Sequence, residues 1–211
     1  GPSVGVFLYN AKSYGLDCTG IEMSKDCCKF MSETLKINAI NTNTPEIEIR
    51  KIEKQKAFFL WHSLEHIENP RDVLDACIEK LEPNGLIIIA CPNPNSIGFK
   101  ITSKNWPHLD APRHINLFSI DTLKTYMKKK KLKDIVKTTN DLSSKYYNSF
   151  SWQLFLFNFF NKNETFNFQK KNIRYYFWKL IGKIVTILIY PFENKKLKGS
   201  CYTIVFQKKE I

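Results

Sequence analysis

All four histidines of this 211-residue sequence fall in two short segments that also contain acidic residues. The segments are 61–66 (WHSLEH) and 106–114 (WPHLDAPRH), with Glu65 in the first and Asp110 in the second. Histidine has the ordinary pKa nearest to neutral pH, so it is often used to move a proton or to bind a metal ion. Because no histidine occurs elsewhere, we expect the two segments to meet at one cleft.

Each histidine segment follows a short apolar run that is typical of a buried strand. Residues 56–61 lead into the first segment, and 86–91 (LIIIAC) precede the long loop that contains the second. The other expected elements are helices at 6–14, 25–36, 71–81 and 120–130, and strands at 17–23, 39–41, 46–52, 133–138 and 201–206. Strands that alternate with helices predict a parallel α/β sheet, and ligands bind outside the carboxyl ends of such strands.

The composition is that of a basic globular protein with free thiols. There are 32 Lys and Arg against 20 Asp and Glu, and this net charge of +12 favours an anionic partner or simply keeps the surface soluble. Aromatic residues cluster in apolar runs rather than between basic residues, which disfavours nucleic acid as that partner. The six cysteines form no C-x-x-C pair, so we expect no structural zinc site. Free thiols and the absence of a visible signal peptide predict a cytoplasmic protein.

The character of the sequence changes at about residue 150, where aromatic and apolar residues become dense. Residues 173–192 are about as numerous as those of a bilayer-spanning helix, but Lys179 and Lys183 interrupt them. This pattern suits a helix on a membrane surface, at the inner face of the membrane, while a lid and a homodimer surface are the alternatives. We therefore expect a core of 1–149 and 199–211, and a helical insertion of 150–198.

Five motifs in order resemble those of class I S-adenosylmethionine-dependent methyltransferases. The most similar branch is the one termed methyltransferase family 23, which is related to ubiquinone-biosynthesis O-methyltransferases. The motifs are a glycine-rich loop at 1–8 (GPSVGVFL), a strand end at 20–24 (GIEMS), the segment 60–70 (LWHSLEHIENP), a turn and strand at 81–89 (LEPNGLIII), and an acceptor-side loop at 108–114 (HLDAPRH).

The resemblance implies a Rossmann-like α/β sheet, mostly parallel with an antiparallel last strand. The family has a strand before the glycine-rich loop, so we expect this first strand to be truncated here, unless Gly1 and Pro2 are a protease remnant. The implied cofactor is S-adenosylmethionine, and a metal ion is not expected. The implied cofactor contacts are Gly1, Ser3, Gly5, Glu22, Met23, Trp61 and His62. The candidate catalytic residues are His62, Asp110, Arg113 and His114, and the alternative metal set is His62, Glu65 and His66.

These residue types suit the implied chemistry, although each has an alternative structural role. Glycines let the backbone approach a ligand, and Glu22 at a strand end can accept hydrogen bonds from ribose hydroxyls. His62 is a candidate cofactor contact or general base, or else a helix-capping or core histidine. Arg113 suits a phosphate or carboxylate on the acceptor. The alternative is a clamp of Asp110 with Arg113 or with His114 that only shapes the loop.

We therefore predict a methyltransferase that acts on an oxygen of a sugar, a surface-glycan precursor or a quinone-like small molecule. The expected partner is this small or lipid-linked acceptor, with membrane-surface contact and a homodimer as further expectations. The alternative function is a degenerate methyltransferase fold that acts as a binding or scaffold module. It is motivated by the truncated first strand and by the lack of a convincing acid for adenine binding in residues 42–55.

Overall fold

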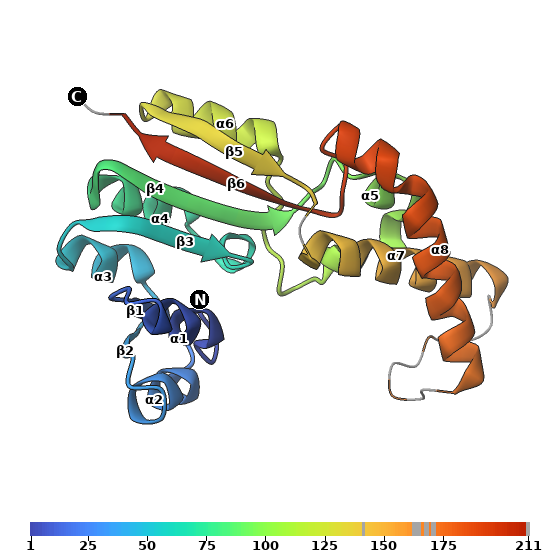
Figure 1. Ribbon diagram of the computed structural model, residues 1–211, viewed down its shortest axis with the longest axis horizontal. Helices are drawn as coiled ribbons and strands as arrows, with labels where there is room; N and C mark the ends of the chain where they lie inside the picture. The colour runs from blue at the N-terminus through green and yellow to red at the C-terminus, as the bar shows by residue number, and fades with distance from the viewer. Residues whose placement is uncertain (141, 162–165, 167–168, 170–171, 210–211) are drawn as a thin grey trace.

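The computed structural model describes residues 1–140, 142–161, 166, 169 and 172–209 (Figure 1). Its strands form two sheets. The first pairs β1 (Thr19–Glu22) with β2 (Asn38–Asn41) in parallel. The second has the order β3 (Gln55–Trp61), β4 (Leu81–Pro92), β6 (Cys201–Lys208) and β5 (Leu132–Thr138). Since β3 runs parallel to β4 and β6 runs antiparallel to both neighbours, the prediction of a mostly parallel sheet with an antiparallel last strand is confirmed.

The helices begin where the local sequence favours it. They are α1 (Val6–Ser13), α2 (Lys25–Glu33), α3 (Pro45–Lys51), α4 (Pro70–Glu79), α5 (Ile97–Thr102), α6 (Ile120–Lys129), α7 (Leu142–Phe160) and α8 (Ile173–Lys195). The hydroxyl oxygens of Ser24 and Ser119 accept bonds from Cys27 N (3.3 Å) and Thr122 N (3.1 Å), and so cap α2 and α6. Pro70 occupies the first turn of α4, where its missing N–H is not needed.

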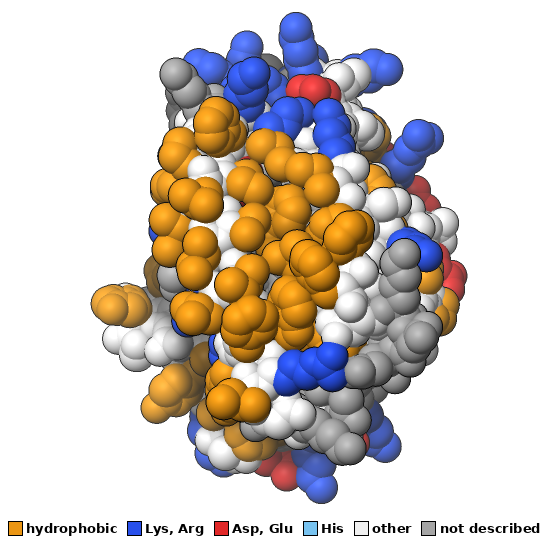
Figure 2. Space-filling model, turned by 90° about the vertical axis from the view of Figure 1, so that its right-hand side faces the viewer, with side chains coloured by type: hydrophobic (Ala, Val, Ile, Leu, Met, Phe, Trp, Pro, Cys, Tyr) orange, Lys and Arg blue, Asp and Glu red, His pale blue; other side chains and the backbone are white. Residues whose placement is uncertain are grey.

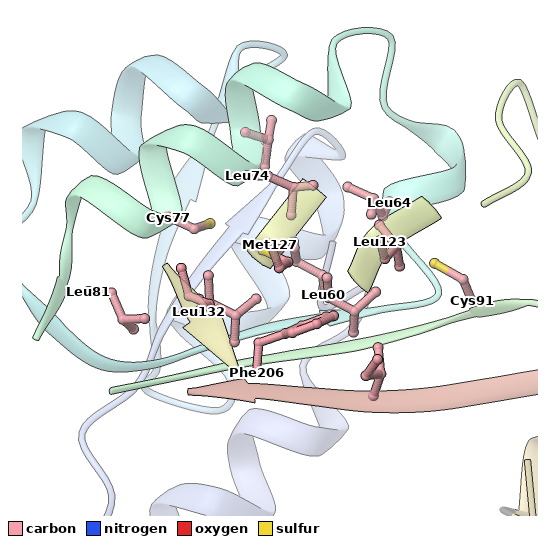
Figure 3. Packing of buried hydrophobic residues seen from close by; sticks show 14 of the residues in the cluster. Leu60, Leu64, Leu74, Cys77, Leu81, Cys91, Leu123, Met127, Leu132 and Phe206 are labelled. Atoms are coloured by element: carbon pink, nitrogen blue, oxygen red, sulfur yellow. The ribbon is translucent and has the colours of Figure 1, made fainter. Parts of the chain in front are cut away.

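The main core lies between the four-stranded sheet and helices α4 and α6 (Figure 3). The sheet contributes Leu60 and Phe206, while α4 contributes Leu74 and α6 contributes Met127. Each fully buried side chain of this size stabilises the fold by roughly 1.5–3 kcal/mol relative to an exposed one. The core therefore fixes the carboxyl ends of β3 and β4, from which the histidine segments continue.

Two expectations about secondary structure were wrong. Residues 46–52 were expected as a strand, but 46–51 lie in α3 and Ile52 caps its end. Pro45 in the first turn, with acids after it and basic residues at the other end, favours the helix. The strand at 56–61 was expected to be buried, yet Phe59 is 47% exposed because β3 lies at the edge of its sheet.

Helices α7 and α8 pack against each other on the right of the sheet in Figure 1. Because α7 already begins at Leu142, the boundary expected at residue 150 falls inside this helix. The division into a core and an insertion stays a prediction. Among the residues that the structure describes, none of the helices has the length and apolar character needed to cross a bilayer.

Candidate active site

The glycine-rich loop, the end of β1 and the end of β3 meet at one place. The amino group of Gly1 donates to the carbonyl of Ile21 at 2.8 Å. A Cβ on Gly1 would lie 3.1 Å from the Cβ of Ser63, which follows β3. Gly5 ends the loop with φ 83°, and a Cβ there would lie 2.6 Å from Met31 Cγ. The loop therefore needs glycine where it passes Ser63 and where it begins α1 against Met31 of α2.

Glu22 is buried at the end of β1 and holds this loop in place. One of its carboxylate oxygens accepts from Ser3 N at 2.9 Å, and the other accepts from Ser24 N at 3.0 Å. Each oxygen retains a second lone pair, because a carboxylate offers about four acceptor positions. Glu22 is thus fixed in orientation and still able to accept hydroxyl donors. Met23 beside it is exposed, as is Trp61 at the end of β3.

His62 is the first residue after β3 and forms a pair with a buried carboxylate. Its Nδ1 lies 3.2 Å from Glu65 Oε1, and Glu65 is 1% exposed. Because a carboxylate only accepts hydrogen bonds, Nδ1 carries the proton and Nε2 keeps a lone pair. Nε2 is buried without a partner among the described residues. The backbone of His62 has φ 48°, a strained conformation of the kind that clusters at functional sites.

The two histidine segments come together as the sequence predicts. The ring of His62 lies 6.4 Å from that of His108, and His108 lies 6.1 Å from His114. The rings of His114 and His66 are 4.7 Å apart. Two hydrogen bonds hold the end of the 106–114 loop, because the backbone amides of Ile115 and Asn116 both donate to the carbonyl of Glu65. One buried acid residue thus anchors both segments, through its side chain and its backbone.

The two charged residues of the 106–114 loop, Asp110 and Arg113, form an ion pair with each other. Arg113 Nη2 donates to Asp110 at 2.8 Å, and the Arg113 side chain is 75% exposed. The carbonyl of Arg113 contacts His66 Nδ1 at 2.8 Å, while His114 Nδ1 contacts the carbonyl of His108 at 2.7 Å. The clamp between Asp110 and Arg113 is therefore present, and the roles of Asp110, Arg113 and His114 toward an acceptor stay predictions.

A metal ion could be held by a set that differs from the expected one. Ligand atoms of Glu65, His66 and His114 lie within 4.8 Å of one another, whereas His62 is bound to Glu65. His66 and His114 both use Nδ1 toward a backbone carbonyl, which leaves Nε2 free. Metal-binding histidines commonly have this second interaction. The geometry is compatible with a divalent ion, and the paired His62 would then stand beside it.

Two residues that the sequence did not single out complete the cluster around His108. Cys201 Sγ, at the start of β6, lies 3.1 Å from His108 Nε2. Tyr147 of α7 places its ring 4.1 Å from that of His108. Both come from distant parts of the chain, so no local signal identified them. Burial, with the neighbouring His62 and His114, lowers the pKa of His108 to about 3, so His108 is neutral at physiological pH.

This lowered pKa predicts that acid destabilises the protein through His108. The unfolded chain takes up a proton below about pH 6.5 and the folded protein does not, so stability falls as the pH decreases toward 3. We expect His108 to account for a loss of about 2 kcal/mol between pH 8 and pH 5. Urea unfolding of the protein and of His108→Gln at both pH values measures it. The destabilisation caused by the substitution should shrink by that amount at pH 5.

The comparison of the unchanged protein with His108→Gln also cancels the pH dependence that comes from a second buried group. Burial raises the pKa of Glu193 to about 7, which makes the folded protein lose stability as the pH rises. This dependence has the opposite sign, but it is common to the protein and its His108→Gln variant. Equal pH dependence of the two would show that His108 is protonated in the folded protein.

The chain resembles known methyltransferases in sequence and fold. A family model described as a methyltransferase domain matches residues 1–135. Comparison with curated proteins finds no match. An S-adenosylmethionine-dependent methyltransferase from Archaeoglobus fulgidus is 17% identical with a TM-score of 0.62, over 99% of this chain and 83% of that one.

Two further solved structures share the fold. A putative sarcosine dimethylglycine methyltransferase from Galdieria sulphuraria is 13% identical, with a TM-score of 0.61 over 99% of this chain and 76% of that one. Phosphoethanolamine N-methyltransferase 2 from Haemonchus contortus, in complex with S-adenosylmethionine, is 13% identical, with a TM-score of 0.56 over 100% of this chain and 47% of that one.

Since the family model covers more than half of the chain, the protein belongs to this family of methyltransferases. Solved structures that share the fold include a methyltransferase named as dependent on S-adenosylmethionine and another in complex with it. The residues present fit this cofactor, because the glycine-rich loop and the oriented Glu22 lie at one sheet edge beside the end of β3. A mainly apolar hollow next to this loop is lined by Val4, Val6, Tyr9, Phe30 and Leu35.

Proposed function

We propose that the protein transfers a methyl group to a hydroxyl oxygen of a sugar, a surface-glycan precursor or a quinone-like small molecule. The observation that supports this proposal is the pair of His62 and the buried Glu65, with a buried and unpartnered Nε2 on His62. A hydroxyl becomes a good nucleophile when a base removes its proton during attack. A neutral imidazole that is held by a carboxylate is suited to that role.

The proposed mechanism assigns one task to each part of the site. S-adenosylmethionine supplies an electrophilic methyl group. The glycine-rich loop from Gly1 to Gly5 and Glu22 bind and orient the cofactor, with Met23 and Trp61 beside it. His62 Nε2 accepts the proton of the acceptor hydroxyl, and Glu65 keeps the His62 ring in position and stabilises its protonated form. The 106–114 loop, with Asp110, Arg113 and His114, positions the acceptor.

Binding and turnover can be tested separately. We expect calorimetry to detect stoichiometric binding of S-adenosylhomocysteine. We also expect the transfer of labelled methyl from S-adenosylmethionine to at least one hydroxyl compound in a panel of sugars, nucleotide sugars and quinols. If S-adenosylhomocysteine does not bind, the proposed function is wrong. Transfer only to amines would contradict the role of His62 as a base for oxygen. Binding without transfer to any acceptor would favour the binding-module alternative.

A further inference from the structure

The pair of helices α7 and α8 buries several polar residues and exposes many apolar ones. Helix α8 faces α7 with Gly182, Thr186 and Glu193, all of which are buried. A Cβ on Gly182 would lie 2.5 Å from the carbonyl oxygen of Ser149, so the helices approach closely there. Asn148 Nδ2 donates to Glu193 Oε2 at 2.5 Å. These contacts fix which face of α8 points away from the protein.

The opposite face of α8 is an exposed apolar surface, which we call the α8 outer face. Its exposed fractions run from 44% at Ile184 to 89% at Ile173. Figure 2 shows this side of the molecule with a continuous hydrophobic area and Lys or Arg side chains at its margins. The outer face consists of Ile173, Phe177, Leu180, Ile184, Ile187, Leu188 and Phe192. Exposed apolar areas of this kind mark binding surfaces for proteins or membranes.

The charge around the outer face distinguishes between these two partners. Residues 142–200 contain ten Lys and Arg and two acids, so they carry +8 of the net charge of +12. One of the two acids is Glu193, which is buried against α7. Lys183 is exposed on α8, and Lys145 Nζ lies 5.6 Å from the ring centre of Tyr190. A second copy of the chain would bring another strongly basic segment against the first, whereas an anionic surface is complementary.

We propose that the α8 outer face binds the surface of an anionic phospholipid bilayer. The helix lies in the interface with its apolar side chains among the acyl chains, while the flanking lysines contact lipid phosphates. The exposed Tyr176 beside the outer face suits the level of the headgroups. Binding in this orientation needs no bilayer-spanning helix, in agreement with the described helices. The proposal is independent of the methyl acceptor.

Sedimentation with sucrose-loaded vesicles tests the proposal on the whole protein. We expect binding to vesicles of equimolar phosphatidylcholine and phosphatidylglycerol to be at least about tenfold stronger than to phosphatidylcholine alone, and to weaken with added salt. The double change Leu180→Asp and Ile187→Asp should weaken binding by at least about tenfold, because both side chains leave the acyl region. Changing Lys179 and Lys183 to Gln should weaken it about fivefold for each lysine.

A control introduces one negative charge elsewhere, as the single change Leu180→Asp does on the outer face. Tyr14→Asp alters a side chain that is 86% exposed and lies just after α1. We expect this variant to bind vesicles as strongly as the unchanged protein does. Equal binding to both vesicle types, or equal loss in Tyr14→Asp, would overturn the proposal. Analytical ultracentrifugation without lipid provides a further test. A dimer that Leu180→Asp dissociates would assign the outer face to a second copy instead.

Discussion

Replacement of His62 by alanine is expected to lower the turnover of methyl transfer by about two to four orders of magnitude. The variant loses the buried Nε2 lone pair of His62, so the acceptor hydroxyl keeps its proton. Steady-state kinetics with labelled S-adenosylmethionine measures the loss in kcat. Because His62 neighbours the cofactor loop, the affinity for S-adenosylhomocysteine also decreases, but by less than turnover.

Two companion variants separate the base from its neighbours. Glu68→Gln changes an exposed side chain just after the 61–66 segment, and we expect little change in kcat. Glu65→Gln keeps the size of the side chain but removes the charge that stabilises protonated His62. We expect the acidic limb of the pH profile of kcat/KM to move to lower pH in this variant. Full turnover in His62→Ala, together with a loss of two or more orders of magnitude in His114→Ala, would transfer the role of base to His114.

Replacement of Glu22 by glutamine is expected to weaken the binding of S-adenosylhomocysteine by roughly one to two orders of magnitude. Hydrogen bonds to a charged group contribute about 1.5–3 kcal/mol each, and glutamine keeps only one acceptor oxygen. That oxygen must serve both the loop amide of Ser3 and the ribose, whereas the carboxylate serves Ser3, Ser24 and the ribose together. Calorimetric titration measures the change.

The control for Glu22→Gln is Asp26→Asn, which removes one negative charge from an exposed position in the first turn of α2. We expect this variant to bind S-adenosylhomocysteine with unchanged affinity. Circular dichroism and the unfolding midpoint show whether Glu22→Gln has retained its fold. A folded Glu22→Gln variant that binds as tightly as the unchanged protein would exclude Glu22 from the cofactor site.

The parts of the fold that depend on local sequence could be predicted from it. Ser24, Pro70 and Ser119 mark helix starts by chemistry that acts within one turn, and all three helices form. Residues 45–51 contain the competing signals of a strand-like alternation and a helix start, and the helix forms because Pro45 and the terminal charges favour it. The exposure of Phe59 depends on the order of strands, which the residues of β3 alone do not determine.

The candidate site also has contacts that follow from local sequence and contacts that depend on the tertiary fold. His62 and Glu65 are three residues apart, so their contact follows from local geometry, and the carboxyl end of the strand indicates where they lie. Cys201 reaches His108 because β6 lies next to β4 in the sheet, and Tyr147 reaches it because α7 lies beside the 106–114 loop. Such contacts join residues that are far apart in the sequence and depend on tertiary packing. No local sequence pattern therefore predicts them.

The position of β6 also has a consequence for the growing chain on the ribosome. This strand lies between β4 and β5, with Ile204 and Phe206 almost fully buried, and Leu86 of β4 pairs with Gln207. Translation proceeds at about 5–20 residues per second, so β4 waits on the order of ten seconds for this partner. During that time one edge of β4, which contains Ile87, Ile88 and Ile89, offers unpaired backbone groups. We therefore expect an interval during synthesis in which the nascent chain exposes this unpaired strand edge and is open to aggregation.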